Sequence, residues 1–242
     1  MKITFIGTSH GVPSADRFCS CYMIEVGGKI YMVDAGAPAA EMILRNGGDI
    51  NKFCALFTTH VHSDHTFGMI HLISLMNWYY KESSADFFIT EQSHLDATVR
   101  WVETSGSGSF PAHRLRMKVP REGVVYWDEN VKVEYIATKH CPNSYSVLIS
   151  SGDKRALFGG DFSQWLAKED VPEIIEEELD LFVCEMAHFT KDQITPYLEK
   201  CHAKTVAFTH VYPLDKYSDI EEMKGKYPFE ILTPNDGFML EF

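Results

Sequence analysis

The residues best suited to chemistry in this chain are gathered in one short run. Three imidazoles and one carboxylate fall within six positions: His60, His62, Asp64 and His65. Imidazole nitrogen and carboxylate oxygen are the ligands that zinc and related divalent ions use in proteins. On an extended backbone His60 and His62 project to the same side and can share one ion, while Asp64 and His65 follow at a turn and can face a second. The run therefore predicts a metal site.

The elements that must position this run are buried strands that end in loops. The segment Cys54-Ala55-Leu56-Phe57 has the apolar character of such a strand and leads directly into the run. Further candidate ligands follow other strand-like segments: His140 after 131–137, Asp161 after 155–159 and His210 after 205–208. Taken singly, each has an ordinary interpretation as a strand-end histidine or a turn aspartate. Their recurrence at strand ends favours a site wall built from several strands.

The remaining pattern alternates strands and helices without a linker or an evident repeat. Predicted strands lie at 2–6, 20–26, 29–33, 87–90, 123–127, 144–150 and 181–185, with one or two short ones in the tail. Predicted helices lie at 38–46, 67–80, 92–103 with Ser93 as N-cap, 170–178 and 191–201. We expect one domain over residues 1–242, with two facing sheets and helices outside them.

Composition restricts the partners. The chain has 242 residues, 45% of them hydrophobic, and a formal net charge of -12. Such a field repels polyanions, so nucleic acid is disfavoured and any phosphate must be held locally. No apolar run approaches the roughly 20 residues of a membrane span. The strand-like start at Met1 lacks the features of a signal peptide, and the six cysteines therefore predict reduced thiols in the cytoplasm.

The full constellation resembles the metallo-β-lactamase superfamily over nearly the whole chain. The resemblance rests on the His60-x-His62-x-Asp64-His65 motif followed in order by His140, Asp161 and His210. It implies an α+β fold, a four-layer αβ/βα sandwich of one domain with a two-metal site between the sheets. In the family's pattern one metal is held by His60, His62 and His140 and the other by Asp64, His65 and His210, with Asp161 between them. Asp34, in Val33-Asp34-Ala35-Gly36, matches a family aspartate that supports the site.

Residues outside the ligand set indicate which branch of this superfamily the chain resembles. The opening run of residues 5–14, Phe-Ile-Gly-Thr-Ser-His-Gly-Val-Pro-Ser, looks like that of the ribonuclease Z and phosphodiesterase branch. His188, twenty-two residues before His210, resembles the branch's extra histidine near the leaving group, with Glu185 as its carboxylate partner. Ribonuclease Z carries a long tRNA-gripping arm, commonly between the positions of His140 and Asp161, where this chain has only twenty residues. The spacing is closer to that of arm-less phosphodiesterases.

These features predict a metal-dependent hydrolase, most of all a phosphodiesterase for a small or cyclic phosphodiester. Two divalent ions, zinc by ligand type with manganese or iron as alternatives, bring a bound water to a pKa of about 7 and so supply hydroxide. Asp64 is expected to orient that hydroxide, and His188 with Glu185 to protonate the leaving group. The alternatives are a ribonuclease Z-like RNA endonuclease, a lactone or thioester hydrolase, and a non-catalytic metal-binding sensor.

Some expectations rest on position alone. His10 in the first loop, and Asn143 and Tyr145 just after His140, are candidates for substrate contacts. Cys19 and Cys21 partly echo a structural zinc site of one arm-less phosphodiesterase, without a nearby third cysteine. The apolar stretch from Met69 to Tyr80 is typical of core or of a homodimer interface.

Overall fold

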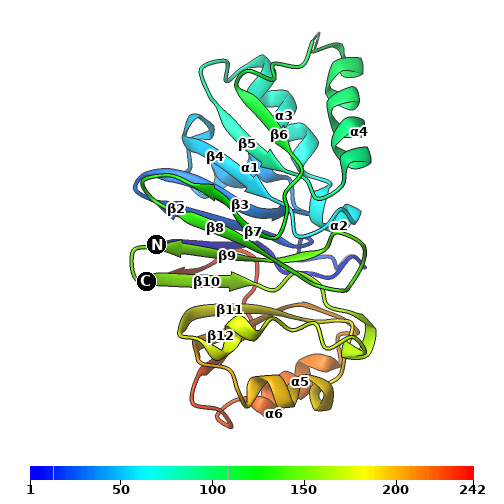
Figure 1. The fold of residues 1–242 in the computed structure, drawn as a ribbon, viewed down its shortest axis with the longest axis vertical. Coiled ribbons are helices and arrows are strands. Elements are labelled where there is room, and N and C mark those ends of the chain that lie inside the picture. Colours follow the sequence, from blue (N-terminus) through cyan, green and yellow to red (C-terminus); the bar gives the residue numbers. More distant parts are fainter. Residues whose placement is uncertain (13, 108) are drawn as a thin grey trace.

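The computed structural model describes every residue of the chain except Pro13 and Gly108, so that part of the opening loop motif lies outside the described residues. Its strands form two sheets of seven (Figure 1). The first has the order β14 (Phe238–Glu241), β1 (Lys2–Gly7), β2 (Cys21–Val26), β3 (Lys29–Ala35), β4 (Phe53–Phe57), β5 (Ala85–Phe88), β6 (Leu115–Lys118). The second has the order β13 (Glu230–Leu232), β12 (Ala203–Val211), β11 (Leu179–Met186), β10 (Lys154–Phe158), β9 (Tyr145–Ser151), β8 (Lys132–Ala137), β7 (Gly123–Trp127).

Helices cover the outer face of each sheet. In Figure 1 the helices α1 (Ala39–Arg45), α3 (Met69–Trp78) and α4 (Gln92–Val102) lie beyond the first sheet, and α5 (Lys191–Leu198) and α6 (Lys216–Met223) beyond the second. Single turns complete the structure: α2 (Ser63–Thr66), 3-10 turns at Ile50–Lys52, Gln164–Leu166 and Glu173–Glu176, and a π turn at Glu103–Ser107. The predicted four-layer sandwich is confirmed.

Three apolar cores hold these layers together, and alternation along the strands assigns side chains to them. On β11, Leu181 and Val183 enter the core between the sheets, whereas Phe182 and Cys184 enter the core beneath α5 and α6. The third core lies between the first sheet and its helices, and Met32 of β3 belongs to it. Central strands are thus apolar on both faces, which explains why their sequences read as continuous hydrophobic runs.

Several sequence-based expectations were wrong in detail. Residues 170–178 form only the 3-10 turn Glu173–Glu176, because the Asp170 carboxylate accepts hydrogen bonds from the backbone N–H groups of Ser163 and Lys139 and ties its segment to two loops. Glu91, not Ser93, precedes α4 at the N-cap, and neither caps it by a side-chain bond. Strand β5 starts at Ala85, two residues early, and β6 and α6 were not predicted.

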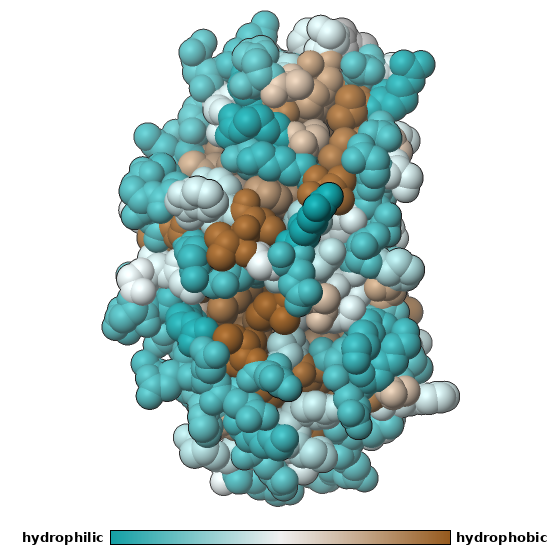
Figure 2. All heavy atoms as spheres, in the orientation of Figure 1, coloured by the Kyte–Doolittle hydropathy of each residue, from teal (hydrophilic) through white to brown (hydrophobic). Residues whose placement is uncertain are grey.

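The apolar stretch after the histidine run packs mainly as core. Met69, Leu72, Ile73 and Met76 of α3 are buried, which agrees with the core interpretation. Phe67, just before the helix, is 72% exposed. Figure 2 shows a mostly hydrophilic face with apolar patches near α3 and α4. The homodimer interface stays a prediction.

Chain ends are brought together by the first sheet. Strand β14 pairs antiparallel with β1, with Lys2 opposite Glu241. Among the described residues, no helix is long and apolar enough to cross a membrane.

Candidate metal centre

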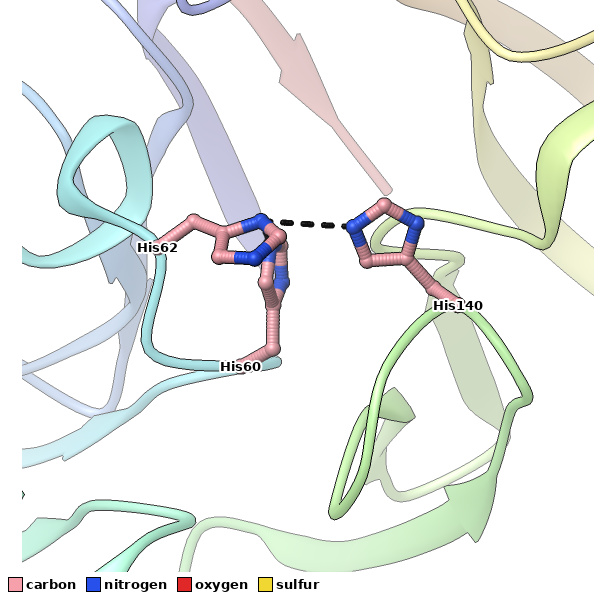
Figure 3. Close-up of side chains that lie close together, drawn as sticks. All are labelled: His60, His62 and His140. Atoms are coloured by element: carbon pink, nitrogen blue, oxygen red, sulfur yellow. Dashed lines mark hydrogen bonds between the residues drawn. The ribbon is translucent and has the colours of Figure 1, made fainter.

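The first three-histidine cluster joins two strand ends from different sheets. His60 and His62 follow β4, and His140 follows β8; Figure 3 shows their rings turned toward one another. His62 Nδ1 lies 3.0 Å from His60 Nε2 and 3.3 Å from His140 Nε2. Bonds of about 2.0–2.1 Å in a tetrahedral zinc site place ligand nitrogens about 3.3 Å apart. The cluster has the dimensions of a zinc site.

A second cluster lies beside it and consists of Asp64, His65 and His210, whose ligand atoms lie within 4.8 Å of one another. Asp64 Oδ2 is 3.7 Å from His65 Nε2 and 3.8 Å from His210 Nε2. His210, near the end of β12, has a φ of 52°, a left-handed conformation that is uncommon for a non-glycine residue and directs its ring inward from the strand.

Asp161 stands between the two clusters. One of its oxygens, Oδ2, lies 3.8 Å from both His60 Nε2 and His140 Nε2, and 3.5 Å from His210 Nε2. The other, Oδ1, lies 3.5 Å from His65 Nε2. The carboxylate thus faces imidazoles of both groups, which is the position that a bridging ligand requires.

Hydrogen bonds behind the rings fix which nitrogen points inward. His140 Nδ1–H donates to the carbonyl of Phe162 at 3.0 Å, and His65 Nδ1–H donates to Asp34 at 2.7 Å. When neutral, as a metal ligand must be, each of these rings carries its lone pair on the inward Nε2. His62 Nδ1 faces the Nε2 atoms of both His60 and His140. A proton on His62 Nδ1 could be donated to only one of them, whereas a bound cation can be coordinated by all three nitrogens.

Buried polar atoms in the centre also call for cations. His65 Nε2 and Asp161 Oδ1 are buried and make no hydrogen bond to the described residues. Burial raises the pKa of Asp161 to about 7, and burial followed by the neighbouring imidazoles lowers the pKa of His60 well below its ordinary value. Divalent ions remove both penalties, because they hold the carboxylate ionised and accept neutral imidazole. The residues present fit a metal centre.

Asp34 organises the loop that carries the histidine run. It is buried at the end of β3 and accepts hydrogen bonds from Thr59 N at 2.7 Å, from Thr59 Oγ1 at 2.9 Å and from His65. Thr59 Oγ1 in turn accepts from His60 Nδ1 at 3.1 Å. One carboxylate thus orients a ring from each metal cluster, as its predicted supporting role requires.

Two glycines allow the first loops to approach Asp64 closely. A Cβ on Gly36 would lie 1.8 Å from the Asp64 carbonyl oxygen, and one on Gly11 would lie 2.6 Å from Asp64 Oδ2. Both distances are impossible for real side chains without movement. The loop after β1 is therefore packed directly against a predicted ligand.

His188 and Glu185 form the predicted pair at the end of β11. His188 Nδ1 donates to Glu185 Oε1 at 2.8 Å, and the buried carboxylate also accepts from the backbone N–H groups of Phe162, Ala187 and His188. Burial alone would lower the pKa of His188, but the Glu185 carboxylate outweighs it and raises the pKa above the ordinary value. The His188 ring lies 4.7 Å from that of His140 and is partly exposed at the rim.

The three predicted substrate contacts are placed differently. The His10 ring lies 4.7 Å from the ring of His210, beside the second cluster. Asn143 donates its side-chain amide to Glu91 at 2.8 Å, and Tyr145 packs its ring edge-on against Tyr135. Only His10 touches the ligand set, and the contacts of Asn143 and Tyr145 with substrate stay predictions.

Sequence reasoning missed several groups that support the rings. Ser20 Oγ lies 2.9 Å from His210 Nδ1, and Tyr212 stacks on His10. Ser20 lies between the two cysteines considered for zinc. Cys21 is fully buried on β2, and in the part of the chain that the structure describes no metal-binding cluster contains Cys19 or Cys21. At this position the side chain that contacts the candidate ligand set is the Ser20 hydroxyl, and a structural zinc at Cys19 and Cys21 stays a prediction.

Metal removal is expected to lower the melting temperature. A ligand present at 100 times its Kd stabilises a protein by about 2.7 kcal/mol, and about 2–4 °C follows per kcal/mol at this chain length, so chelation should cost about 5–10 °C. Calorimetry of metal-loaded protein with and without a chelator measures it. An unchanged melting temperature, with metal analysis confirming removal, would contradict the metal centre.

Comparisons with solved structures support the same fold. The short form of human tRNase Z (ELAC1) superposes with a TM-score of 0.75 at 18% identity, covering 100% of this chain and 99% of that chain. The metallo-β-lactamase fold protein YhfI from Bacillus subtilis gives 0.77 at 18% identity, with 100% and 99% covered. A diphosphatase of the PhnP family gives 0.68 at 21% identity, with 100% and 97% covered.

Curated relatives match part of the sequence. Ribonuclease Z of Cyanothece sp. is 28% identical over 162 residues, which cover 65% of this chain and 49% of that protein. Ribonuclease Z of Nitrosopumilus maritimus is 28% identical over 160 residues, covering 65% of this chain and 52% of that protein. The chain spans about half the length of the curated relatives it matches.

Fold and ligand set together define a member of the metallo-β-lactamase superfamily, in its ribonuclease Z-like branch. Within that branch, a family model described as Anti-Pycsar protein Apyc1 matches residues 1–229, and the chain belongs to this family.

Proposed function

We propose that this protein is a metal-dependent phosphodiesterase for small or cyclic phosphodiesters, with residues 1–242 acting as one hydrolase domain. One observation carries the proposal: seven ligands gather into two clusters around Asp161, next to the His188–Glu185 pair. The clusters account for charge neutralisation on a phosphoryl group, and the pair accounts for protonation of the leaving oxygen.

The ligand set suits two divalent ions, with zinc favoured by five imidazoles and manganese or iron as alternatives. His60, His62 and His140 would hold one ion and Asp64, His65 and His210 the other, with Asp161 between them. When bound, the ions supply Lewis acidity toward the phosphoryl oxygens and lower the pKa of water. Asp64 accepts a hydrogen bond from the attacking water and orients it toward phosphorus.

A ribonuclease Z-like RNA endonuclease is the second candidate, because the curated relatives bear that name. Two observations disfavour it. The net charge of -12 repels a long polyanion. Between His140 and Asp161 the chain forms the β9–β10 hairpin, with Ser151 opposite Lys154, and no arm. A compact anionic substrate fits the site better than tRNA.

Two further candidates use the same residues. A lactone or thioester hydrolase needs the same activated water. A thioester releases a thiolate, which departs without a proton, whereas a lactone releases an alkoxide that needs one, as a diester does. A metal-binding sensor without catalysis needs the metal ligands but not His188. The ordered His188–Glu185 pair favours an enzyme with an alkoxide leaving group, and the substrate panel decides between a diester and a lactone.

Replacing His62 with alanine is expected to abolish diester turnover, with a loss of at least about 10³-fold, because the first cluster loses the nitrogen that faces both of its partners. The assay uses bis-nitrophenyl phosphate, a cyclic nucleotide, an acyl lactone and a precursor tRNA. His202→Ala is the matched control, because His202 is exposed after α5, outside the metal clusters.

The substrate panel separates the candidates. Turnover of the two diesters, lost in His62→Ala and kept in His202→Ala, supports the phosphodiesterase. Lactone turnover without diester turnover overturns it in favour of acyl chemistry, and efficient cleavage of precursor tRNA overturns the preference for small substrates. Metal binding without turnover of any member indicates a sensor.

We also propose that the protein is cytoplasmic, which is supported by its six free cysteines.

We further propose a homodimer, which is supported by the exposed aromatic side chains of Phe67 and Trp101 that line a groove of about 830 Å³ next to the histidine run. The molar mass in solution tests it.

A further inference from the structure

The loop after β1 and the end of β12 are joined beside the second metal cluster. The backbone N–H of His210 donates to the carbonyl oxygen of Thr8 at 2.9 Å. The side chain and backbone N–H of Thr8 both donate to Asp236, which anchors the loop from behind. His10 and Tyr212, each two residues beyond this bond, are thereby brought side by side at the rim of the site.

Tyr212 and His210 fix the His10 ring in place. The rings of His10 and Tyr212 are stacked, with centroids 4.7 Å apart and planes 10° apart. The ring of His210 meets His10 edge-on at the same separation, with planes 65° apart. Tyr212 is 40% exposed, so the stack forms part of the surface of the site and not of the core.

A backbone hydrogen bond fixes the tautomer of His10. The N–H of Val12 donates to His10 Nδ1 at 3.0 Å, so that nitrogen carries a lone pair and the proton of the neutral ring is on Nε2. No described residue accepts a hydrogen bond from His10 Nε2. The stack therefore presents an oriented and unused N–H donor beside the metal centre.

The position of this donor suits a phosphoryl oxygen. The His10 ring lies 4.7 Å from that of His210 and 6.3 Å from that of His188, and those two rings are 6.2 Å apart, so His10 flanks both the second metal cluster and the predicted acid. Ligands of that cluster offer carboxylate oxygen and imidazole lone pairs, which accept hydrogen bonds and cannot donate to an anion. A donor here complements the negative oxygen of a phosphate that the metals do not hold.

We propose that His10 Nε2–H binds a non-bridging phosphoryl oxygen of the substrate, and that Tyr212 is the positioning residue that holds the His10 ring for this contact. The inference rests on the proposed phosphodiesterase function and adds a substrate-binding group on the side of the second metal. His10 is no metal ligand in this arrangement, since none of the metal-binding clusters among the described residues includes it.

Orthophosphate binding to the metal-loaded protein tests the proposal apart from turnover. Titration calorimetry compares wild type with His10→Phe, which keeps the stack and removes the donor. The expected weakening is roughly 10- to 100-fold, the effect of one hydrogen bond to a charged group. His10→Gln, whose amide reaches a similar point, should recover most of the affinity. Metal analysis must give equal loading for all proteins.

Tyr212 is tested through rescue. Tyr212→Phe preserves the stacking face and should bind phosphate like wild type, whereas Tyr212→Ala releases the ring and should weaken binding roughly 5- to 20-fold, less than removal of the donor itself. With a diester substrate, His10→Phe should raise KM more than it lowers kcat. A merely structural role for the stack predicts the reverse order: His10→Phe, which keeps the stack, should bind phosphate like wild type, and His10→Gln, which has no ring to stack on Tyr212, should bind it more weakly.

The outcomes separate this inference from the proposed function. If phosphate binding depends on His10 but the protein hydrolyses no diester, the His10 contact is supported and the proposed phosphodiesterase function is wrong. If the protein hydrolyses diesters and His10→Phe equals wild type in both phosphate binding and turnover, only the His10 contact is wrong. Absence of phosphate binding by the metal-loaded wild type overturns the contact as well.

Discussion

Replacing Asp161 with alanine is expected to reduce bound metal and to eliminate turnover more completely than any other single change. Its two oxygens face His60, His140 and His210 on one side and His65 on the other, within 3.5–3.8 Å. Loss of a group that merely orients a ligand costs about 10–100-fold in metal affinity, so loss of a group shared by both clusters should exceed about 100-fold. Metal analysis after dialysis and a diester assay measure both effects.

A matched buried aspartate serves as the control. Asp180 is also about 5% exposed and accepts hydrogen bonds from the Arg155 backbone and from Lys204, but it lies at the start of β11, away from the strand ends that carry the site. Asp180→Ala should lose stability and keep its metal and activity per folded molecule. If Asp161→Ala retained two metals with wild-type turnover, the shared-ligand arrangement would be wrong.

The sequence was most informative where the chemistry is local. His60, His62, Asp64 and His65 lie within one turn after a strand, so their spacing alone determines how they face ions. His140 and Asp161 follow strands of the second sheet and His210 lies near the end of one, and the sequence showed each of them close behind an apolar strand-like segment. Position at strand ends thus indicated the candidate ligands, while their division between two metals came from the resemblance to the family and stays a prediction.

Contacts between distant segments were not accessible in the same way. The pairing of β14 with β1 and the Thr8–His210 bond join residues more than 200 positions apart, and no periodicity encodes them. The Tyr212 stack on His10 depends on both. Likewise, the acidic run after Asp170 reads as helix, yet that carboxylate is used to bind backbone N–H groups of other loops, which local propensity cannot anticipate.

Removing His188 should slow poor leaving groups far more than good ones. An alkoxide needs a proton as it departs, whereas nitrophenolate leaves unaided, and general acid catalysis contributes about 10²–10⁴-fold. His188→Ala should therefore lose about that factor with a cyclic nucleotide and less than about 10-fold with bis-nitrophenyl phosphate. Glu185→Gln should show the same selectivity in weaker form, because Glu185 holds the His188 ring at 2.8 Å and favours its protonated state.

The pH dependence of turnover shows whether the protonated form of His188 is the active one. Because Glu185 raises the pKa of His188 above 6.5, the imidazolium is present below that raised pKa and is lost as the pH rises through it. Turnover of the alkoxide substrate should fall on this alkaline side in wild type, and the fall should be absent from His188→Ala and from the nitrophenyl substrate. Equal losses on both substrates, or an alkaline limb that survives the substitution, would exclude His188 as the acid and leave it a role in orienting the loop next to Asp161.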